Sequence, residues 1–188
     1  MLNTKVIAVC GQIGSGKSSI IRELSKTYGW NTVSFGAYIK SQIAADRPTR
    51  TDYQSLGEML FATRGPKGLL EDAIRFGKPC SSTFLIDGVR HVSIVTELRR
   101  IYGEVLLIFL DVSDSHRYER FTRRNDTDPP MSYDDFVQMC SHPIEQGIPD
   151  LAKIADVVID GNVDFEVVLT KILSHLNKDS PSVARPKA

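Results

Sequence analysis

The stretch Gly11-Gln12-Ile13-Gly14-Ser15-Gly16-Lys17-Ser18 follows a short apolar run at residues 6–10 and precedes apolar residues that recur at helical spacing from Ile20 onward. It matches the pattern G-x-x-x-x-G-K-[ST], in which glycines let backbone N–H groups close around a phosphate. The N-terminus of the following helix adds its positive dipole end to that site. The sequence therefore predicts a strand–loop–helix unit that binds a nucleoside triphosphate.

The residue types of this loop also indicate how the nucleotide is held. Lys17 is expected to reach the outer phosphates, and the Ser18 hydroxyl is expected to bind Mg²⁺, which makes ATP and Mg²⁺ the expected cofactors. We assign nucleotide contacts to the loop and the first helical turn: Gly11, Gly14, Ser15, Gly16, Lys17, Ser18 and Ser19.

The composition fits one globular domain, because the chain has 188 residues, of which 41% are hydrophobic and 24% charged. Lys plus Arg equals Asp plus Glu at 23 each, so neither nucleic acid nor an anionic membrane is an expected partner. Cys10, Cys80 and Cys140 lie far apart without C-x-x-C spacing, which predicts reduced thiols. With no signal-peptide pattern and no bilayer-length apolar stretch, we expect a cytoplasmic protein.

Short apolar runs alternate with helical patterns along the chain, which predicts an α/β fold with helices on both faces of a five-stranded parallel sheet. The expected strands are Val6–Cys10, Thr32–Phe35, Thr83–Ile86, Val105–Leu110 and Val157–Ile159. The last helix is expected to bury Phe165, Val168, Leu169 and Ile172. A P-loop domain over 1–177 and a disordered tail over 178–188 follow from this pattern.

Two segments interrupt the alternation. The first, 41–78, is mainly helical and polar with breaks at Pro48 and Gly65-Pro66, and we expect it to bind the second substrate. The second, 125–150, is rich in Asp and Pro and contains a helix-opening pattern at Ser132. Long insertions at the ligand edge of a sheet often act as lids, so a lid is expected here.

Asp87 and Arg90 emerge where the third strand ends, at the edge where parallel α/β sheets bind ligands. A carboxylate there can hold Mg²⁺ or its waters. The alternative is that Asp87 caps the next helix and Arg90 lies in solvent. Strand-end position favours the functional interpretation.

Two basic clusters lie beside the inserted segments. Arg120, Arg123 and Arg124 share one helix face immediately before the second insertion, and such a cluster suits a polyphosphate. The alternative is a solvated helix face. Lys40, Arg47 and Arg50 form a second basic set, in and beside the first insertion, where an anionic acceptor would enter.

The four histidines have no metal-ligand spacing, so structural roles are expected for them. The stretch His142-Pro143-Ile144-Glu145 is interpreted as a local polar hook without a catalytic role.

Together these motifs resemble the P-loop nucleoside and nucleotide kinases, which include adenylate kinase, dephospho-CoA kinase and deoxynucleoside monophosphate kinases. Val33–Lys40 is similar to an adenylate-kinase stretch that ends in an arginine on the monophosphate, with lysine in its place here. Asp87–Arg90 is similar to the adenylate-kinase D-G-x-P-R element without its proline, and to the D-x-R element of deoxynucleoside monophosphate kinases. Arg50 with Gln54–Glu58 resembles the acceptor-side helix of the latter, and Ala155–Asn162 the closing strand and base-side loop of dephospho-CoA kinases.

The resemblance implies transfer of the γ-phosphoryl group of MgATP to a small anionic acceptor, with a (deoxy)nucleoside monophosphate as the expected acceptor. It implies catalytic roles for Lys17, Asp87 and Arg124, a Mg²⁺ site at Ser18 and Asp87, and an ATP contact from Arg120. Acceptor contacts are expected from Lys40, Arg50, Arg90 and Arg123. A P-loop ATPase or a nucleotide-sensing module without a small-molecule acceptor stays open as the alternative.

Overall fold

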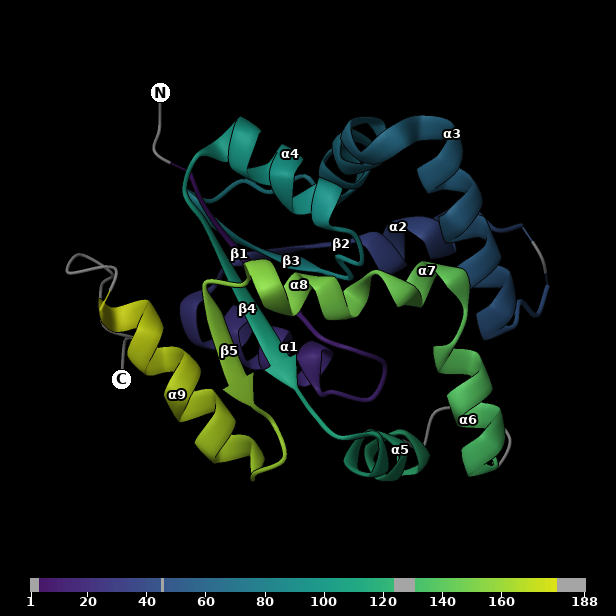
Figure 1. Cartoon of the computed structure of the whole chain (residues 1–188). Helices are drawn as coiled ribbons and strands as arrows, with labels where there is room; N and C mark the ends of the chain where they lie inside the picture. The colour runs from purple at the N-terminus through teal and green to yellow at the C-terminus, as the bar shows by residue number, and fades with distance from the viewer. Residues whose placement is uncertain (1–3, 45, 124–130, 179–188) are drawn as a thin grey trace.

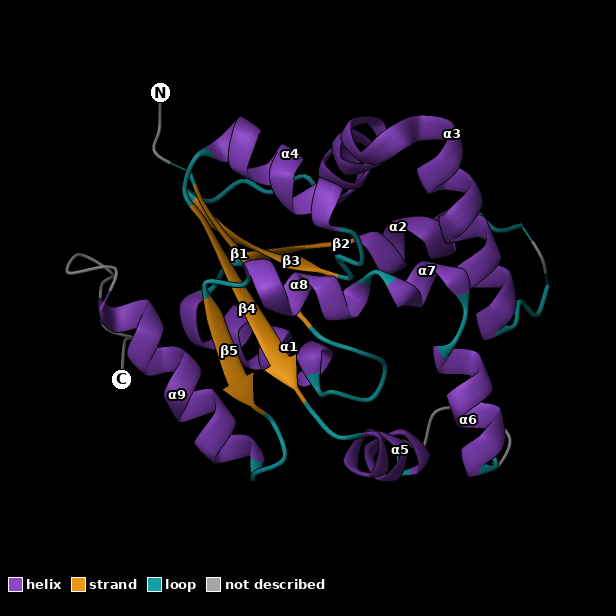
Figure 2. Cartoon of the chain, viewed as in Figure 1, coloured by secondary structure: helices purple, strands orange, loops and turns teal. Residues whose placement is uncertain are grey.

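The computed structural model describes residues 4–44, 46–123 and 131–178. Figures 1 and 2 show its elements, which follow one another in the order β1 (Lys5–Cys10), α1 (Lys17–Tyr28), β2 (Asn31–Ser34), α2 (Phe35–Ser41), α3 (Arg50–Gly77), β3 (Thr83–Asp87), α4 (Val92–Tyr102), β4 (Val105–Asp111), α5 (Asp114–Thr122), α6 (Tyr133–Cys140), α7 (Pro143–Gln146), α8 (Ile148–Ile154), β5 (Val157–Asp160) and α9 (Phe165–Lys178).

The strands form one parallel, five-stranded sheet in the order β2-β3-β1-β4-β5, which confirms the predicted fold class. The central strand β1 is buried along its whole length, as expected for an apolar run covered on both faces. Because all strands run the same way, their carboxyl ends meet at one edge. The loop at 11–16 therefore leaves the sheet beside the ends of β3 and β4.

Helices cover both faces of the sheet and complete three layers. The apolar core on one face is built with α2, α3, α4 and α8, and the core on the other face with α1 and α9 (Figure 1). Alternate residues of β1 serve the two cores, with Val6 and Ala8 in the first and Ile7 and Val9 in the second. The phosphate-binding loop is thus anchored to both layers.

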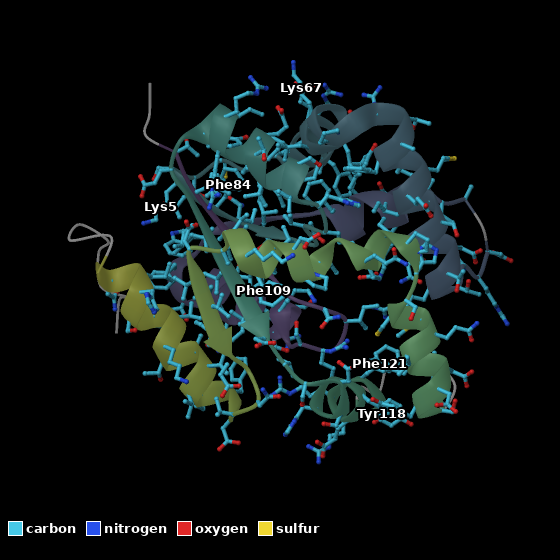
Figure 3. All side chains as sticks on the ribbon, viewed as in Figure 1. Lys5, Lys67, Phe84, Phe109, Tyr118 and Phe121 are labelled. Carbon is cyan, nitrogen blue, oxygen red and sulfur yellow. The ribbon has the colours of Figure 1, made fainter. Side chains whose placement is uncertain are left out.

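A third, smaller core joins α5 to α6. It contains Ile13 from the loop after β1, Phe121 and the fully buried Phe136, with Tyr118 packed against them. Figure 3 labels Tyr118 and Phe121 on α5 at this junction. Through Ile13, this core connects the phosphate-binding loop to α6.

Three details differ from the sequence prediction. Phe35 was expected at the end of a strand but begins α2, because the Ser34 hydroxyl accepts a hydrogen bond from Ala37 N at 3.2 Å and caps a helix there. Phe165 was expected in the core, yet it begins α9 at 39% exposure. Lys178 was expected in the tail but is the last residue of α9.

The first inserted segment is a helix that bends. Gly65 interrupts α3 with φ 64° and ψ 173°, which confirms the predicted break at Gly65-Pro66. Of the second segment, the described residues form α6, α7 and the start of α8. None of the helices that the structure describes has the length and apolar character needed to cross a bilayer.

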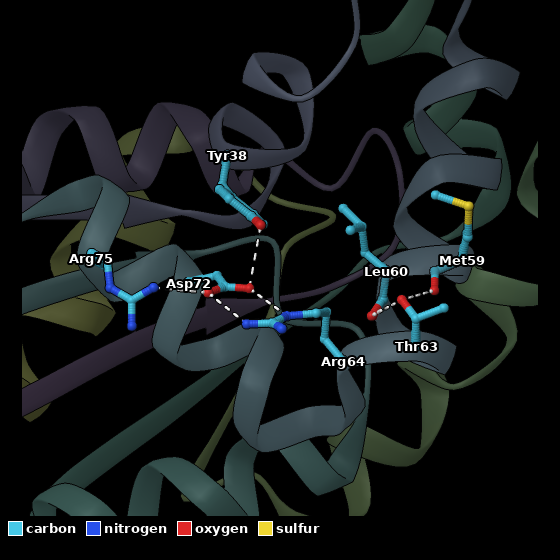
Figure 4. A network of polar contacts seen from close by, with 7 residues as sticks. All are labelled: Tyr38, Met59, Leu60, Thr63, Arg64, Asp72 and Arg75. Carbon is cyan, nitrogen blue, oxygen red and sulfur yellow. Dashed lines mark hydrogen bonds and ion pairs between the residues drawn. The ribbon is translucent and has the colours of Figure 1, made fainter.

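The two halves of α3 are tied together across the bend by one carboxylate (Figure 4). Asp72 accepts hydrogen bonds from Arg64 Nε at 2.8 Å and Arg64 Nη2 at 3.1 Å, and from Arg75 Nη1 at 3.3 Å. The Tyr38 hydroxyl of α2 donates to it at 3.4 Å. The hydrogen bonds from Arg64 hold the pKa of Asp72 below its usual range.

We predict that Asp72→Asn lowers the free energy of unfolding at pH 7 by about 1 kcal/mol, because it removes the charge that these donors share. A carboxylate with a lowered native pKa stabilises the fold above its unfolded pKa of about 4 and loses that effect as the pH falls through the native pKa. The difference between wild type and variant should therefore shrink between about pH 5 and pH 3 in urea titrations.

Glu71→Gln is the matched control, because the neighbouring Glu71 pairs with Lys67 at 3.9 Å on the surface. A deficit for Asp72→Asn that stays constant with pH would contradict this account of the bend.

Candidate active site

The loop at residues 11–16 adopts a conformation that requires glycine. Gly11, Gly14 and Gly16 have φ angles of 145°, 84° and 92°. At Gly14 there is also no room for a side chain, since a Cβ would overlap the Arg117 carbonyl oxygen of α5. The backbone conformation therefore favours glycine at all three positions, and at Gly14 the close approach of α5 excludes any side chain as well.

Lys17 is the first residue of α1 and lies against the loop. Its ammonium donates to the Gln12 carbonyl oxygen at 2.8 Å and to Ser15 Oγ at 3.4 Å. Burial lowers the pKa of Lys17 to about 8, although the nearby carboxylates of Asp87 and Glu145 act in the opposite direction. A cation that is costly to bury and poorly compensated favours binding of an added anion.

One pocket, which we call the first pocket, opens beside the loop at the carboxyl edge of the sheet. Five of the residues predicted to act chemically line it: Lys17, Ser18, Arg50, Asp87 and Arg90. The pocket has a volume of about 160 Å³. These residues come from α1, from the start of α3 and from the end of β3, so the fold brings together what the sequence separates.

Ser18 and Asp87 supply hard oxygen donors to this pocket. Mg²⁺ prefers such ligands and keeps several of its waters, so a hydroxyl and a carboxylate beside a phosphate site fit that ion. Within the described residues no cluster of three or more acidic, His or Cys side chains forms a ready-made metal site. The donor set therefore suits Mg²⁺ that arrives with a phosphate.

Arg90 lines the first pocket and forms an ion pair there. Its Nη1 lies 2.7 Å from Glu145 Oε1 of α7, and the same oxygen accepts from Gln54 Nε2 of α3 at 3.0 Å. The Glu145 and Gln54 side chains are buried, whereas Arg90 keeps 28% of its side chain exposed. Arg90 is thus held at one end of its guanidinium while part of its side chain stays accessible.

A second pocket, of about 520 Å³, lies on the other side of the loop, among α5, the start of α1 and the start of α9. Arg120 crosses it, donating to the Gly161 and Val163 carbonyl oxygens at 2.6 and 3.3 Å and to the Ser15 carbonyl oxygen at 3.4 Å. Ser15, Gly16 and Ser19 line this pocket as well. The loop therefore forms a wall of both pockets.

Of the described residues predicted to act in catalysis or to bind the acceptor, Lys40 and Arg123 do not line the first pocket. Lys40 is exposed at the end of α2, with its ammonium 5.5 Å from the centre of the Tyr53 ring. Arg123 lines the second pocket instead and pairs with Glu119 at 2.6 Å. Arg124 lies outside the described residues.

Two residues that the sequence patterns did not place in the site are central to it. Arg117, one turn before Arg120, is only 2% exposed and donates to the Ile13 carbonyl oxygen at 2.9 Å and to Asp114 at 2.6 Å. Glu145, which was interpreted as part of a local hook, carries the buried pair with Arg90. The only sequence signal for Arg117 was its i, i+3 spacing to Arg120, and Glu145 had none beyond its charge.

His91 also lines the first pocket. Its ring stacks on Phe61 with centroids 3.9 Å apart and planes inclined by 17°, and its buried Nε2 has no hydrogen-bond partner among the described residues. Burial and the neighbouring Arg90 lower the pKa of His91. A flat, neutral ring pair thus forms one wall of the pocket.

Known proteins resemble this chain in sequence and in fold. Residues 7–139 match the family model described as an AAA domain. A UPF0200 protein of Pyrobaculum aerophilum is 30% identical over 154 residues, which cover 82% of this chain and 86% of the relative. One of Thermococcus kodakarensis is 24% identical over 182 residues, covering 91% and 97%.

Solved kinases share the architecture. Shikimate kinase from Acinetobacter baumannii, in complex with shikimate, has a TM-score of 0.62 at 17% identity and covers 94% of either chain. A gluconokinase from Sinorhizobium meliloti has a TM-score of 0.56 at 18% identity, covering 95% of this chain and 98% of its own. At these identities the likeness shows the α/β P-loop fold alone.

We predict that Gly14→Ala destabilises the protein by about 1–3 kcal/mol more than Gly29→Ala, because the added methyl group strikes a backbone carbonyl. Gly29 is the matched control. It has a comparable φ of 69° and open space within 4 Å of where a Cβ would lie, so its substitution costs only the backbone strain, about 1 kcal/mol. Urea unfolding of both variants measures the difference. Equal destabilisation would mean that α5 does not constrain the loop.

Proposed function

This chain belongs to the AAA-domain family and to the UPF0200 proteins, and on that premise we propose that it is an ATP-dependent phosphotransferase. It moves the γ-phosphoryl group of MgATP to a small anionic acceptor, a (deoxy)nucleoside monophosphate or a compound of similar shape. The chain's P-loop fold and its two pockets on either side of the loop support this proposal.

The observation that carries the proposal is the convergence of Lys17, Ser18, Asp87, Arg50 and Arg90 on the first pocket. The first three suit the outer phosphates of a nucleotide with its Mg²⁺. The two arginines suit a second anion, because a guanidinium binds phosphate or carboxylate in a planar, bidentate manner. An ATPase needs no site for a second anion beside the loop.

The pocket walls favour a nucleotide-like acceptor over a polyol. Beside the stacked rings of Phe61 and His91 lie Phe35, Ile39 and Ile144. Shikimate and gluconate carry several hydroxyl groups, and burying those against aliphatic walls leaves hydrogen bonds unmade. A planar base buries its faces against such walls without that cost.

In the proposed reaction an acceptor oxygen attacks the γ-phosphorus in line, and the bond to the bridging oxygen of ADP breaks. Lys17 stabilises the charge on the transferred group, and Arg50 and Arg90 fix the acceptor's anion. Mg²⁺, held at Ser18 and Asp87, would neutralise charge on the donor phosphates. The protein contributes mainly by positioning, since phosphoryl transfer needs little covalent help.

The donor's base is assigned to the second pocket. Arg120 is fixed there by carbonyl oxygens on both sides, so its guanidinium plane is available for contact with a base. Asn162 shapes the opposite wall by accepting from the Ser113 N–H at 2.9 Å. Donor and acceptor would thus meet across the loop, with Lys17 between them.

We predict that one nucleoside monophosphate stimulates ADP formation from MgATP strongly in a panel of ribo- and deoxynucleoside monophosphates, nucleosides, shikimate and gluconate. Lys17→Met should reduce this turnover by a factor of about 10³ or more while the circular dichroism spectrum is retained. Lys26→Met, on the exposed face of the same helix, is the matched control. ADP formation that no acceptor stimulates would instead favour an ATPase or a nucleotide sensor.

We also predict that MgATP binding takes up a proton above pH 8. The pKa of Lys17 is lowered to about 8, and an adjacent phosphate favours the ammonium form and raises it. Affinity for MgATP should therefore fall as the pH rises from about 8 to about 9.5. Calorimetry at about pH 8.5 in two buffers of different ionisation enthalpy counts the proton, and Lys17→Met should show none. Proton-neutral binding by the wild type would contradict this role of Lys17.

A further inference from the structure

The Arg90–Glu145–Gln54 network joins three segments far apart in the chain. Arg90 follows β3, Gln54 lies in the first half of α3, and Glu145 lies in α7. Glu145 Oε1 forms an ion pair with Arg90 Nη1 at 2.7 Å and accepts a hydrogen bond from Gln54 Nε2 at 3.0 Å. A carboxylate with 4% of its side chain exposed is costly to bury, and the ion pair with Arg90 and the hydrogen bond from Gln54 offset that cost.

Two glycines allow the segments that carry this network to pack closely against one another. At Gly147, immediately after α7, a Cβ would lie 2.9 Å from the Arg90 carbonyl oxygen. At Gly57 of α3, a Cβ would lie 2.9 Å from Ile144 Cδ1, the residue before Glu145. The helix that carries Glu145 is therefore pressed against both the Arg90 loop and α3, and its carboxylate has a defined place.

The network fixes how Arg90 is presented. Among the described residues, its guanidinium forms an ion pair at Nη1, and the partner is the buried Glu145 carboxylate in the pocket wall. This ion pair restricts where the planar guanidinium lies and leaves its Nε and Nη2 donors for another partner. With 28% of the side chain exposed, Arg90 borders the first pocket and can offer these remaining donors to a ligand.

We propose that Glu145, supported by Gln54, is a positioning residue that orients the guanidinium of Arg90 toward the anionic group of the phosphate acceptor. This inference rests on the proposed function and adds a residue to it. Glu145 acts through Arg90 and does not itself touch the acceptor. The network also balances charge, because an unpaired Arg90 would stand as a second cation beside Lys17 and a lone Glu145 as a buried anion.

The test is a double-mutant cycle with Glu145→Gln and Arg90→Lys, assayed with the best acceptor of the nucleoside monophosphate panel. Glu145→Gln should raise the acceptor KM about tenfold and leave the KM of MgATP within about twofold. In the Arg90→Lys background, Glu145→Gln should change the acceptor KM by less than about twofold, because the guanidinium that Glu145 orients is absent. Gln54→Ala removes the supporting donor, together with its hydrogen bond to the Met139 carbonyl oxygen at 3.4 Å, and should raise the acceptor KM about threefold.

Asp150→Asn is the matched control, since Asp150 pairs with Lys153 at 2.7 Å on the exposed face of α8. A purely structural network would lower the unfolding midpoint without an acceptor-specific change in KM. The inference fails if Glu145→Gln shifts both KM values equally, shifts neither, or adds fully to Arg90→Lys. If Glu145→Gln does not fold, Gln54→Ala decides by the same criterion.

The proposed function and this inference fail in different ways. If the wild-type protein neither transfers phosphate to nor binds any acceptor of the panel, both fall. If it binds an acceptor without turnover, the same double-mutant cycle is measured through the Kd of the acceptor. If the wild type is active and the variants keep its acceptor KM, only the positioning role of Glu145 is overturned.

Discussion

The candidate site depends on the contact between the buried guanidinium of Arg117 and the phosphate-binding loop. It donates to the Ile13 carbonyl oxygen at the tip of the phosphate-binding loop, and the Arg117 carbonyl oxygen lies where Gly14 leaves no room for a side chain. Burying a guanidinium is costly, and removing one partner of such a group leaves the rest uncompensated. The loop and α5 therefore hold each other in one arrangement.

From this contact the packing continues into the wall of the first pocket. The Arg117 guanidinium lies 5.5 Å from the centre of the Phe136 ring, and α6 leads directly into α7 with Glu145. Glu145 then reaches Arg90 and Gln54. The phosphate-binding loop and the proposed acceptor site are thus linked by one connected set of contacts.

Sequence patterns predicted the parts of the structure that depend on local order. The buried strands, the glycine loop and the bend at Gly65 all have short-range causes, namely apolar runs and φ preferences. The rule that ligands gather at strand ends predicted Asp87 and Arg90 at the edge where the first pocket lies. The prediction for Phe165 was wrong, because helical periodicity does not indicate at which residue the rest of the fold begins to pack against the helix.

Long-range contacts decided what the sequence did not reveal. Arg117 and Arg123 lie six residues apart on and just after α5, yet Arg117 is 2% exposed and the Arg123 side chain is 76% exposed, because α6 packs over only one of them. Glu145 meets Gln54 across 91 residues of chain. No local pattern distinguishes a charged residue with such a partner from one in solvent, so the roles of Arg117 and Glu145 became visible only in the folded chain.

The fate of the γ-phosphate separates phosphotransfer from hydrolysis. In a reaction of Mg²⁺, the stimulating nucleoside monophosphate and ATP radiolabelled at the γ-phosphate, we expect the label to move to the nucleoside diphosphate with little release of inorganic phosphate. Label that appears only as inorganic phosphate, at a rate independent of the acceptor, would contradict phosphotransfer and identify the protein as an ATPase.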